Sequence, residues 1–285
     1  MTEKNHFHSS GERAWCPGCG DFGILSSVEN ALMNLGKRPH EVLIVSGIGQ
    51  AAKLPHYINT NGFDGLHGRA LPAAFGAKAA NHRLQVLVTS GDGDIYGEGG
   101  NHFIHAIRRN IDITLIVHNN QIYGLTKGQA SPTSDLGMVT KTQPNGVSTI
   151  PFNSLAIAIT LDAVFVARSF SREMEFTTQL IEEGVRTPGF SLIEILQPCV
   201  SFNTVNTYKW YSERVYKLDS PYDPADKLQA YKKSGEWGEK IPIGVLYKKP
   251  RRTFLDNQFK PKDLPLFQRK TVMKEIISLT NELFE

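Results

Sequence analysis

The sequence predicts an α/β fold in which a parallel β-sheet carries helices on both faces. Five short segments are apolar nearly throughout and rich in β-branched residues, as strands buried on both faces are: 42–46, 84–89, 113–118, 163–167 and 190–196. Amphipathic segments alternate with them, at residues 22–35, 73–80, 101–109, 152–160 and 172–184. Strand–helix alternation of this kind favours βαβ units and therefore a parallel sheet.

The pattern changes after Cys199. Residues 201–219 are aromatic and polar without a clear period, and residues 221–285 are rich in Lys and Pro, with one further helix expected at 271–284. We therefore expect one α/β domain over residues 1–200. An irregular C-terminal extension over residues 201–285 should pack on this core or on a partner chain.

Composition excludes several classes of protein. The chain has 285 residues, of which 40% are hydrophobic and 21% charged, and its net charge of +3 is too small to indicate nucleic acid or an acidic membrane. The N-terminus is polar and no apolar run is long enough to cross a bilayer. We expect a cytoplasmic protein that binds neither nucleic acid nor membranes. Its three cysteines fit no structural disulfide framework.

Two loops follow neighbouring strands of the predicted sheet. Residues 84–89 lead into Gly91-Asp92-Gly93-Asp94, and residues 113–118 lead into Asn119-Asn120, with 25 residues between Gly93 and Asn119. Ligands of parallel sheets bind beyond the carboxyl ends of the strands. Glycines and free N–H groups there suit a phosphate. Asp92, the Asn120 amide and the Ile122 carbonyl would supply hard oxygens for Mg²⁺.

Either loop alone is more often a simple tight turn. Together, at this spacing, they resemble the pyrophosphate-binding signature of thiamine-diphosphate enzymes. Further segments resemble one family in particular, the β subunit of two-subunit 2-oxoacid:ferredoxin oxidoreductases. These are Trp-Cys-Pro-Gly-Cys-Gly-Asp (15–21), Gly-Leu-His-Gly-Arg (65–69), Tyr-Gly-Leu-Thr-Lys-Gly-Gln-Ala-Ser-Pro-Thr (123–133) and Gln-Pro-Cys (197–199). The similarity runs in order from about residue 15 to about residue 247.

The resemblance implies a chemical role. The family cleaves a 2-oxoacid on thiamine diphosphate, releases CO₂, passes electrons through iron–sulfur chemistry to ferredoxin and transfers the acyl group to coenzyme A. By position, Asp92, Asn120 and the Ile122 carbonyl match the Mg²⁺ ligands. The same resemblance assigns pyrophosphate contacts to Gly93, Asp94 and Thr126, and it places Gly91 in the cofactor-binding loop. It also places His67 near the cofactor.

The glutamate that acts on the aminopyrimidine ring comes from the other, α, subunit in this family. No glutamate of this chain lies in a motif that would nominate it for that role. The resemblance therefore implies half an active site, which is completed in a heterodimer.

The cysteines carry a second set of implications. Taken alone, Cys16-Pro-Gly-Cys19 could be redox-active, zinc-binding or incidental. In the family, Cys16, Cys19, Cys199 and a fourth cysteine hold a [4Fe–4S] cluster. This chain has Gln50 at the fourth position, and an amide is a poor ligand for iron beside thiolate. Three outcomes stay open: a four-iron cluster with a non-cysteine or water ligand, a three-iron cluster, or packed cysteines without a cluster. The positions of the three cysteines favour a bound cluster.

Two lysines are candidates for substrate recognition. Lys53 follows the strand at 42–46, and Lys127 lies in the 123–133 loop. A lysine at either place could pair with a second substrate carboxylate, which would favour 2-oxoglutarate over pyruvate; the alternative is a solvated surface lysine. We also expect Lys53 to act with His67 in catalysis and Leu125 to line both the substrate pocket and the cofactor site.

Two other functions compete with this one. A non-oxidative thiamine-dependent decarboxylase or synthase subunit would use the same cofactor loops. A non-catalytic phosphate-binding module would also need glycine-rich loops. However, the chain has neither a Gly-Lys-Ser/Thr phosphate loop nor a Gly-x-Gly-x-x-Gly motif opening the first helix.

Overall fold

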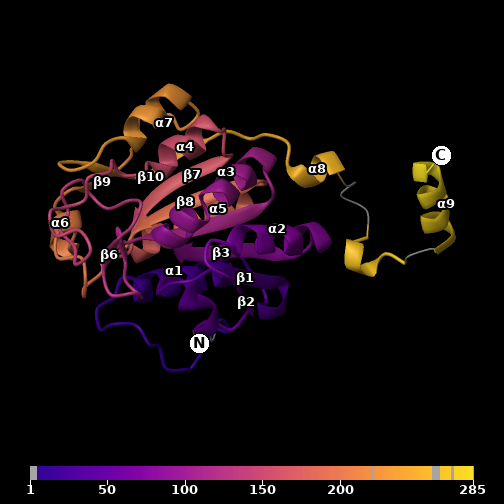
Figure 1. Ribbon diagram of the computed structural model, residues 1–285, viewed down its shortest axis with the longest axis horizontal. Helices are drawn as coiled ribbons and strands as arrows, with labels where there is room; N and C mark the ends of the chain where they lie inside the picture. The colour runs from indigo at the N-terminus through magenta and orange to yellow at the C-terminus, as the bar shows by residue number, and fades with distance from the viewer. Residues whose placement is uncertain (1–4, 220, 259–263, 271–272, 285) are drawn as a thin grey trace.

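The computed structural model describes residues 5–219, 221–258, 264–270 and 273–284. Its centre is an eight-stranded sheet in the order β2-β1-β3-β4-β8-β7-β10-β9 (Figure 1). Neighbouring strands are parallel except for the antiparallel pair β10–β7. The predicted parallel sheet is confirmed. The strands are β1 (Val42–Ser46), β2 (Asn61–Asp64), β3 (Gln85–Gly91), β4 (Ile113–Asn119), β7 (Phe165–Phe170), β8 (Phe190–Leu196), β9 (Val215–Lys217) and β10 (Ile241–Lys248).

Helices cover both faces of the sheet, as predicted. On one face α1 (Asp21–Asn34) packs beside α5 (Met174–Arg186). On the other face lie α2 (Ala70–Ala80), α3 (Gly100–Arg109) and α4 (Ser154–Thr160). All five predicted strands and all five predicted helices of the first 200 residues are present, with ends shifted by three residues at most.

The strands are apolar throughout because each faces two cores. Along β3, Leu87 packs with the helices α1 and α5, whereas Val86 and Val88 pack with α2 and α3. In β4, Ile116 faces the first core and Leu115 the second. Burying an aliphatic side chain of this size contributes about 1.5–3 kcal/mol. The alternation therefore fixes the register of the central strands.

The C-terminal region adds strands that the sequence pattern did not predict. β10 joins the main sheet against β7, and β9 pairs with β10 at the edge. Pro242 and Gly244 interrupt the strand signal, and the register shifts between Val245 and Tyr247. The helices α6 (Tyr208–Ser212) and α7 (Lys227–Ser234) also belong to this region. The proposed division at residue 200 stays a prediction.

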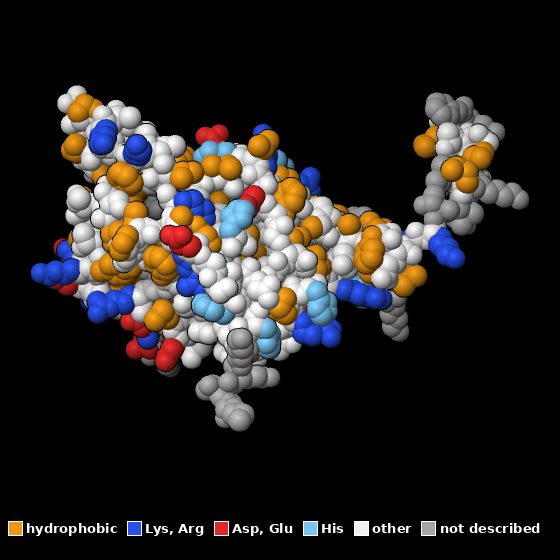
Figure 2. All heavy atoms as spheres, turned by 90° about the horizontal axis from the view of Figure 1, so that it is seen from below, with side chains coloured by type: hydrophobic (Ala, Val, Ile, Leu, Met, Phe, Trp, Pro, Cys, Tyr) orange, Lys and Arg blue, Asp and Glu red, His pale blue; other side chains and the backbone are white. Residues whose placement is uncertain are grey.

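The last described segments lie beyond the sheet (Figure 1), and the end of them stands apart from the rest of the molecule (Figure 2). They are α8 (Phe254–Gln258), the short helical turn η4 (Leu266–Gln268) and α9 (Met273–Phe284). The helix expected at 271–284 is confirmed where the structure describes it; Thr271 and Val272 lie outside the described residues. None of the helices in the described ranges combines the length and apolar character needed to cross a membrane.

Asn110 joins three parts of this fold at the end of α3. Its backbone is left-handed, with φ 54°, and its side chain is buried. Its Oδ1 accepts a hydrogen bond from the Phe190 N–H at 2.9 Å, and its Nδ2 donates to the Arg252 carbonyl at 3.1 Å. One side chain thus fastens the start of β8 and the chain beyond β10 to α3.

We predict that Asn110→Ala lowers the free energy of unfolding by about 2–4 kcal/mol, because buried polar groups lose partners and alanine disfavours the left-handed backbone. Urea denaturation followed by circular dichroism measures this. Arg108→Ala, at an exposed position of the same helix, is the control and should stay within about 0.5 kcal/mol of wild type. Equal effects of the two substitutions would contradict the assignment.

Candidate functional site

The two predicted loops meet at the carboxyl edge of the sheet. β3 and β4 are adjacent and parallel, with Gly91 opposite His118, so the residues that follow the strands lie side by side. The Asn120 N–H points to Asp92 Oδ1 at 3.4 Å, and Asn120 Oδ1 accepts a hydrogen bond from the Ile122 N–H at 3.0 Å. The structure thus brings together Asp92, Asn120 and Ile122, the three residues expected to bind Mg²⁺.

Asp92 is a buried carboxyl whose two oxygens differ. Oδ2 accepts hydrogen bonds from Ser131 Oγ at 2.5 Å and Thr133 Oγ1 at 2.6 Å, while Oδ1 has only the long contact from Asn120. Burial raises the pKa of Asp92 to about 6, against the opposing effect of the two hydroxyl donors. A cation beside Oδ1 would remove this cost. Sequence reasoning did not single out Ser131 and Thr133, although both lie in the 123–133 block.

A cavity of about 80 Å³ opens between these loops. It is lined by Ile48, Gly49, Gln50, Ala51, His67, Gly91, Asp92, Gly93, Asp94, Asn120, Ile122, Tyr123, Gly124, Leu125 and Thr126. All eight residues expected to bind the cofactor, together with His67, line this one cavity. Sites for drug-sized ligands measure roughly 300–1,000 Å³, so the described residues enclose only part of such a molecule.

The chemistry of the lining fits a magnesium diphosphate. Mg²⁺ prefers hard oxygen ligands and takes few from protein. Asp92, Asn120 and the Ile122 carbonyl offer such oxygens. Asp92 also precedes η3 (Gly93–Glu98), a π-helical turn, and the N–H groups that begin a helix favour an anion.

The Asp94 carboxylate, in contrast, is already engaged within the chain. Its Oδ1 accepts hydrogen bonds from the Gly68 N–H at 2.7 Å and the Ile48 N–H at 3.0 Å, and its Oδ2 accepts one from Ser90 Oγ at 2.8 Å. The predicted contact of Asp94 with pyrophosphate would therefore have to come from its backbone N–H. The side chain instead holds three loops together.

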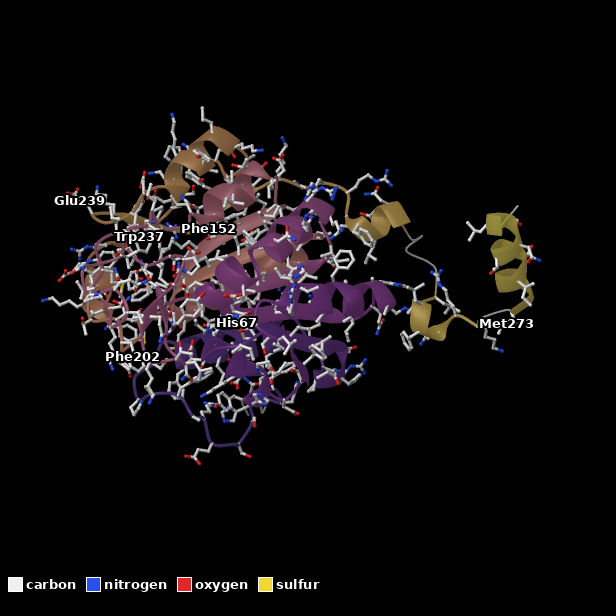
Figure 3. The ribbon with its side chains drawn as sticks, viewed as in Figure 1. His67, Phe152, Phe202, Trp237, Glu239 and Met273 are labelled. Carbon is white, nitrogen blue, oxygen red and sulfur yellow. The ribbon has the colours of Figure 1, made fainter. Side chains whose placement is uncertain are left out.

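His67 lies on the wall of this cavity, near the centre of Figure 3. Its Nδ1 is 2.8 Å from Asp94 Oδ1 without the alignment of a hydrogen bond, and its side chain is 38% exposed. The ring packs edge-on against Tyr123, with centroids 6.1 Å apart. His67 is thus oriented by Asp94 and accessible from the cavity.

The two candidate lysines do not line the cavity. Lys53 lies on η2 (Ala51–His56), a short helical turn, and its Nζ donates to the Ala14 carbonyl at 3.4 Å. Lys127 is exposed at the tip of the loop between β5 (Ile122–Tyr123) and β6 (Gln129–Ala130), with φ 74°. Leu125 is 42% exposed on the cavity rim. Both lysines therefore stay predictions for substrate that extends beyond the rim.

The three cysteines meet at a second, smaller pocket of about 30 Å³. It is lined by Trp15, Cys16, Cys19, Asp21, Gln50, Asn120, Gly124, Gln197, Cys199, Val200, Ser201 and Phe202; Figure 3 labels Phe202. Gln50, Asn120 and Gly124 line both this pocket and the cofactor cavity. The two candidate sites therefore share a wall.

The cysteine pocket offers three thiols and the Gln50 amide as possible ligands. Within the part of the chain that the structure describes, no three His, Cys, Asp or Glu side chains converge on one ion position. Burial, reinforced by the Asp21 carboxyl, raises the pKa of the Cys19 thiol, so Cys19 is no activated free thiolate. Gln50 lines this pocket, and its Oε1 is buried without a hydrogen-bond partner among the described residues.

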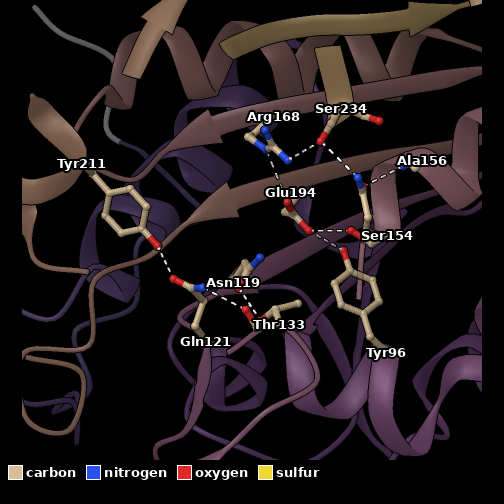
Figure 4. A network of polar contacts seen from close by, with 11 residues as sticks. Tyr96, Asn119, Gln121, Thr133, Ser154, Ala156, Arg168, Glu194, Tyr211 and Ser234 are labelled. Carbon is tan, nitrogen blue, oxygen red and sulfur yellow. Dashed lines mark hydrogen bonds and ion pairs between the residues drawn. The ribbon is translucent and has the colours of Figure 1, made fainter. Parts of the chain in front are cut away.

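Thr133, one of the two donors to Asp92, belongs to a buried polar network, part of which is shown in Figure 4. Thr133 Oγ1, which donates to Asp92, also lies 2.9 Å from Asn119 Oδ1, and Gln121 donates to the Thr133 carbonyl at 2.8 Å. The Tyr211 hydroxyl donates to Gln121 Oε1 at 3.0 Å. Because these partners come from distant segments, no local sequence signal identified them.

Comparisons with known proteins agree with this geometry. Residues 19–195 match the family described as thiamine pyrophosphate enzyme, C-terminal TPP binding domain, and residues 199–262 match the family that describes the C terminal part of the pyruvate ferredoxin oxidoreductase beta subunit. The 2-oxoacid:ferredoxin oxidoreductase subunit beta of Saccharolobus solfataricus is 46% identical over 246 residues, which cover 82% of this chain and 81% of that protein. This chain belongs to the 2-oxoacid:ferredoxin oxidoreductase β-subunit family. It is a subunit of an oxidoreductase.

Other members of this family point the same way. The 2-oxoglutarate oxidoreductase subunit KorB of Mycobacterium tuberculosis is 46% identical over 197 residues, which cover 69% of this chain and 53% of that protein. A solved 2-oxoglutarate:ferredoxin oxidoreductase from Magnetococcus marinus, with 2-oxoglutarate, coenzyme A and succinyl-CoA bound, superposes with a TM-score of 0.88. It is 33% identical, and the match covers 96% of this chain and 94% of that one. All three of these proteins are named as oxidoreductases or their subunits, not as non-oxidative enzymes or binding modules.

We predict that Mg²⁺ affinity depends on the ionisation of Asp92. Because its pKa is raised to about 6, the carboxyl must lose a proton to bind the metal below that pH. Apparent affinity should fall about tenfold per pH unit below this pKa and level off above it. In the metal-free protein the raised pKa favours folding at low pH, and this contribution is lost as pH rises through about 6.

Calorimetric titration of Mg²⁺ with thiamine diphosphate present, from about pH 5 to about pH 8, measures the dependence. Asp92→Asn is the matched control, because it cannot titrate while the cofactor's own ionisation is unchanged. An equal pH dependence in both proteins would show that Asp92 is not the titrating ligand.

Proposed function

We propose that this chain carries the thiamine-diphosphate half of an enzyme that oxidatively decarboxylates 2-oxoglutarate with coenzyme A and reduces ferredoxin. The observation that carries the proposal is the wall shared by the cofactor cavity and the cysteine pocket. A cofactor that loses electrons and a cluster that accepts them must lie close together. A non-oxidative enzyme would have no use for this arrangement.

The cofactor would be held by the residues that line the cavity. Asp92, Asn120 and the Ile122 carbonyl would bind Mg²⁺. Gly91, the N–H groups of Gly93 and Asp94, and Thr126 would face the pyrophosphate. When bound, thiamine diphosphate supplies the nucleophilic carbon and the electron sink for decarboxylation. His67, held by Asp94, offers a group that can donate or accept a proton at the cavity wall.

The partner chain would complete the site. Among the described residues that line the cavity, none is a glutamate, so the group that acts on the aminopyrimidine would come from an α subunit. Large apolar side chains are exposed on and beside the rim: Ile48 at 41%, Leu125 at 42% and Leu66 at 76%. Apolar side chains around a cavity that encloses only part of its ligand suit a covering partner chain.

The proposal that the substrate is 2-oxoglutarate relies on the position of Lys53 and on the names of the relatives. Lys53 lies two residues after Ala51, which lines the cavity, and its contact with the Ala14 carbonyl is long enough to exchange for a carboxylate. A 2-oxoglutarate molecule whose 2-oxo group reached the cofactor would place its second carboxylate away from it, toward the rim. Leu125 on the rim and Lys127, two residues further along the same loop, are secondary candidates. We also propose that the iron–sulfur cluster binds at the cysteines and that the enzyme works in the cytoplasm.

The decisive experiment is anaerobic co-production with the α subunit, followed by coenzyme-A-dependent reduction of ferredoxin with several 2-oxoacids. We expect the highest kcat/KM with 2-oxoglutarate. Iron and sulfide should co-purify with the complex. Ferredoxin reduction that does not require a 2-oxoacid, or no activity with any of them, would remove the proposal.

We predict that Lys53→Ile lowers kcat/KM for 2-oxoglutarate relative to pyruvate by about 10- to 100-fold, since a carboxylate loses a charged partner worth about 1.5–3 kcal/mol. Lys127→Ile tests the second lysine in the same assay. Lys141→Ile, at an exposed site outside the cavity lining, is the control and should leave the ratio unchanged. An unchanged ratio in Lys53→Ile would exclude Lys53 as the carboxylate partner.

A further inference from the structure

We propose that Gln50 occupies the fourth corner of a four-iron cluster held by Cys16, Cys19 and Cys199, and that the iron at this corner is exchangeable. The inference rests on the proposed function, which places a cluster in this pocket. The inference goes beyond the proposed function by assigning a different chemistry to one of the four irons.

Gln50 faces the same small volume as the cysteines. Its backbone carbonyl accepts a hydrogen bond from Trp15 Nε1 at 2.8 Å, which fixes Gln50 beside the segment that carries Cys16. A Cβ atom added at Gly124 would lie 3.9 Å from both Gln50 Cγ and Cys199 Sγ. Gln50 and Cys199 therefore approach each other around Gly124, where a side chain would narrow the pocket.

The amide of Gln50 has no other task among the described residues. Its Oε1 is buried without a partner, and the side chain makes no hydrogen bond there. A buried amide oxygen without a partner costs about 1–3 kcal/mol. A ligand bound in this pocket would supply the partner that the atom lacks.

Two of the three sulfur atoms on the other walls accept hydrogen bonds, as ligand sulfur often does, and Cys19 Sγ also donates to Asp21 Oδ2 at 3.4 Å as a thiol. Ser201 Oγ donates to Cys16 Sγ at 3.1 Å, and Gln197 Nε2 donates to Cys19 Sγ at 3.3 Å. Donors of this kind stabilise ligand sulfur that carries negative charge. Three walls of the pocket thus offer sulfur, and Gln50 offers a neutral oxygen.

Gln197 is the competing amide, because its Oε1 also lacks a partner. Its Nε2, however, donates both to Cys19 Sγ and to the Pro198 carbonyl at 3.0 Å. Those two hydrogen bonds fix the Gln197 amide as a donor to a ligand sulfur. Gln50 is therefore the amide that remains available to bind iron.

As a consequence, the iron bound by Gln50 should be held more weakly than the other three. Cluster iron prefers soft thiolate, and an amide oxygen is a hard, neutral ligand. The iron next to Gln50 should therefore leave first on oxidation. The step balances with a one-electron oxidant such as ferricyanide: a [4Fe–4S]²⁺ cluster gives up one electron and releases Fe²⁺, leaving [3Fe–4S]⁺. Ferrous iron and a reductant reverse it.

The test compares the anaerobically prepared αβ complex as wild type, Gln50→Cys and Gln197→Cys. Ferricyanide is added, and the three-iron cluster is followed by electron paramagnetic resonance together with released Fe²⁺. Wild type should convert with one Fe²⁺ released per cluster. Gln50→Cys should convert at least about tenfold more slowly. Gln197→Cys, the matched control, should give no such protection. Equal lability of wild type and Gln50→Cys, or protection by Gln197→Cys alone, would overturn the assignment.

A second measurement needs no variant. Imidazole, a small ligand that ferricyanide does not oxidise, should replace Gln50 on the exchangeable iron of the wild-type cluster and slow its conversion. No effect at saturating imidazole would overturn the proposal even if Gln50→Cys failed to fold.

CO₂ release from 2-oxoglutarate, measured in the same samples, keeps the two proposals apart. CO₂ release by a complex whose cluster resists oxidation removes the corner assignment alone, whereas a complex without iron and sulfide contradicts both proposals. A labile cluster in a complex that releases no CO₂ supports the corner assignment and removes the proposed function.

Discussion

The buried carboxylate of Asp94 is the interaction on which the site depends. It accepts hydrogen bonds from Ile48 after β1, Gly68 after β2 and Ser90 at the end of β3. Three loops from three neighbouring strands are thus tied to one pair of oxygens. The packing around Asp94 leaves no room for a side chain at two neighbouring glycines. A Cβ at Gly47 would lie 2.1 Å from Asp94 Oδ2, and one at Gly68 would lie 2.4 Å from the Glu98 backbone. The floor of the cofactor cavity is built around this contact.

This constraint separates the roles of two carboxylates only two residues apart. Asp94 has hydrogen-bond donors on both oxygens and acts as a structural tie. Asp92 has one oxygen held by Ser131 and Thr133, and its other oxygen has only a long contact. A buried charge with an unsatisfied oxygen is costly, which is why the pKa of Asp92 is raised by burial. A divalent cation bound at the free oxygen, as proposed, would offset this cost.

The sequence predicted what depends on local pattern. Strands buried on both faces read as apolar runs, and the spacing of Asp92 and Asn120 follows from two strands and one crossover, so both could be identified. β10 was missed because Pro242 and Gly244 interrupt its pattern and tertiary pairing with β7 overrides it. The structural role of Asp94 and the support from Ser131 depend on contacts between distant segments. No single-sequence signal reports such contacts.

Asn120 connects the two halves of the proposed chemistry. Its side chain faces the candidate metal site, and its backbone carbonyl accepts a hydrogen bond from Asn203 Nδ2 at 3.1 Å. The Asn203 N–H in turn donates to the Cys199 carbonyl at 3.2 Å. A shift of the loop that presents Cys199 must therefore disturb either this pair of hydrogen bonds or the position of Asn120. The apolar rim formed by Ile48 and Leu125 lies over the same loops. A partner chain that covers the rim would therefore set the geometry of the cofactor and of the cluster together.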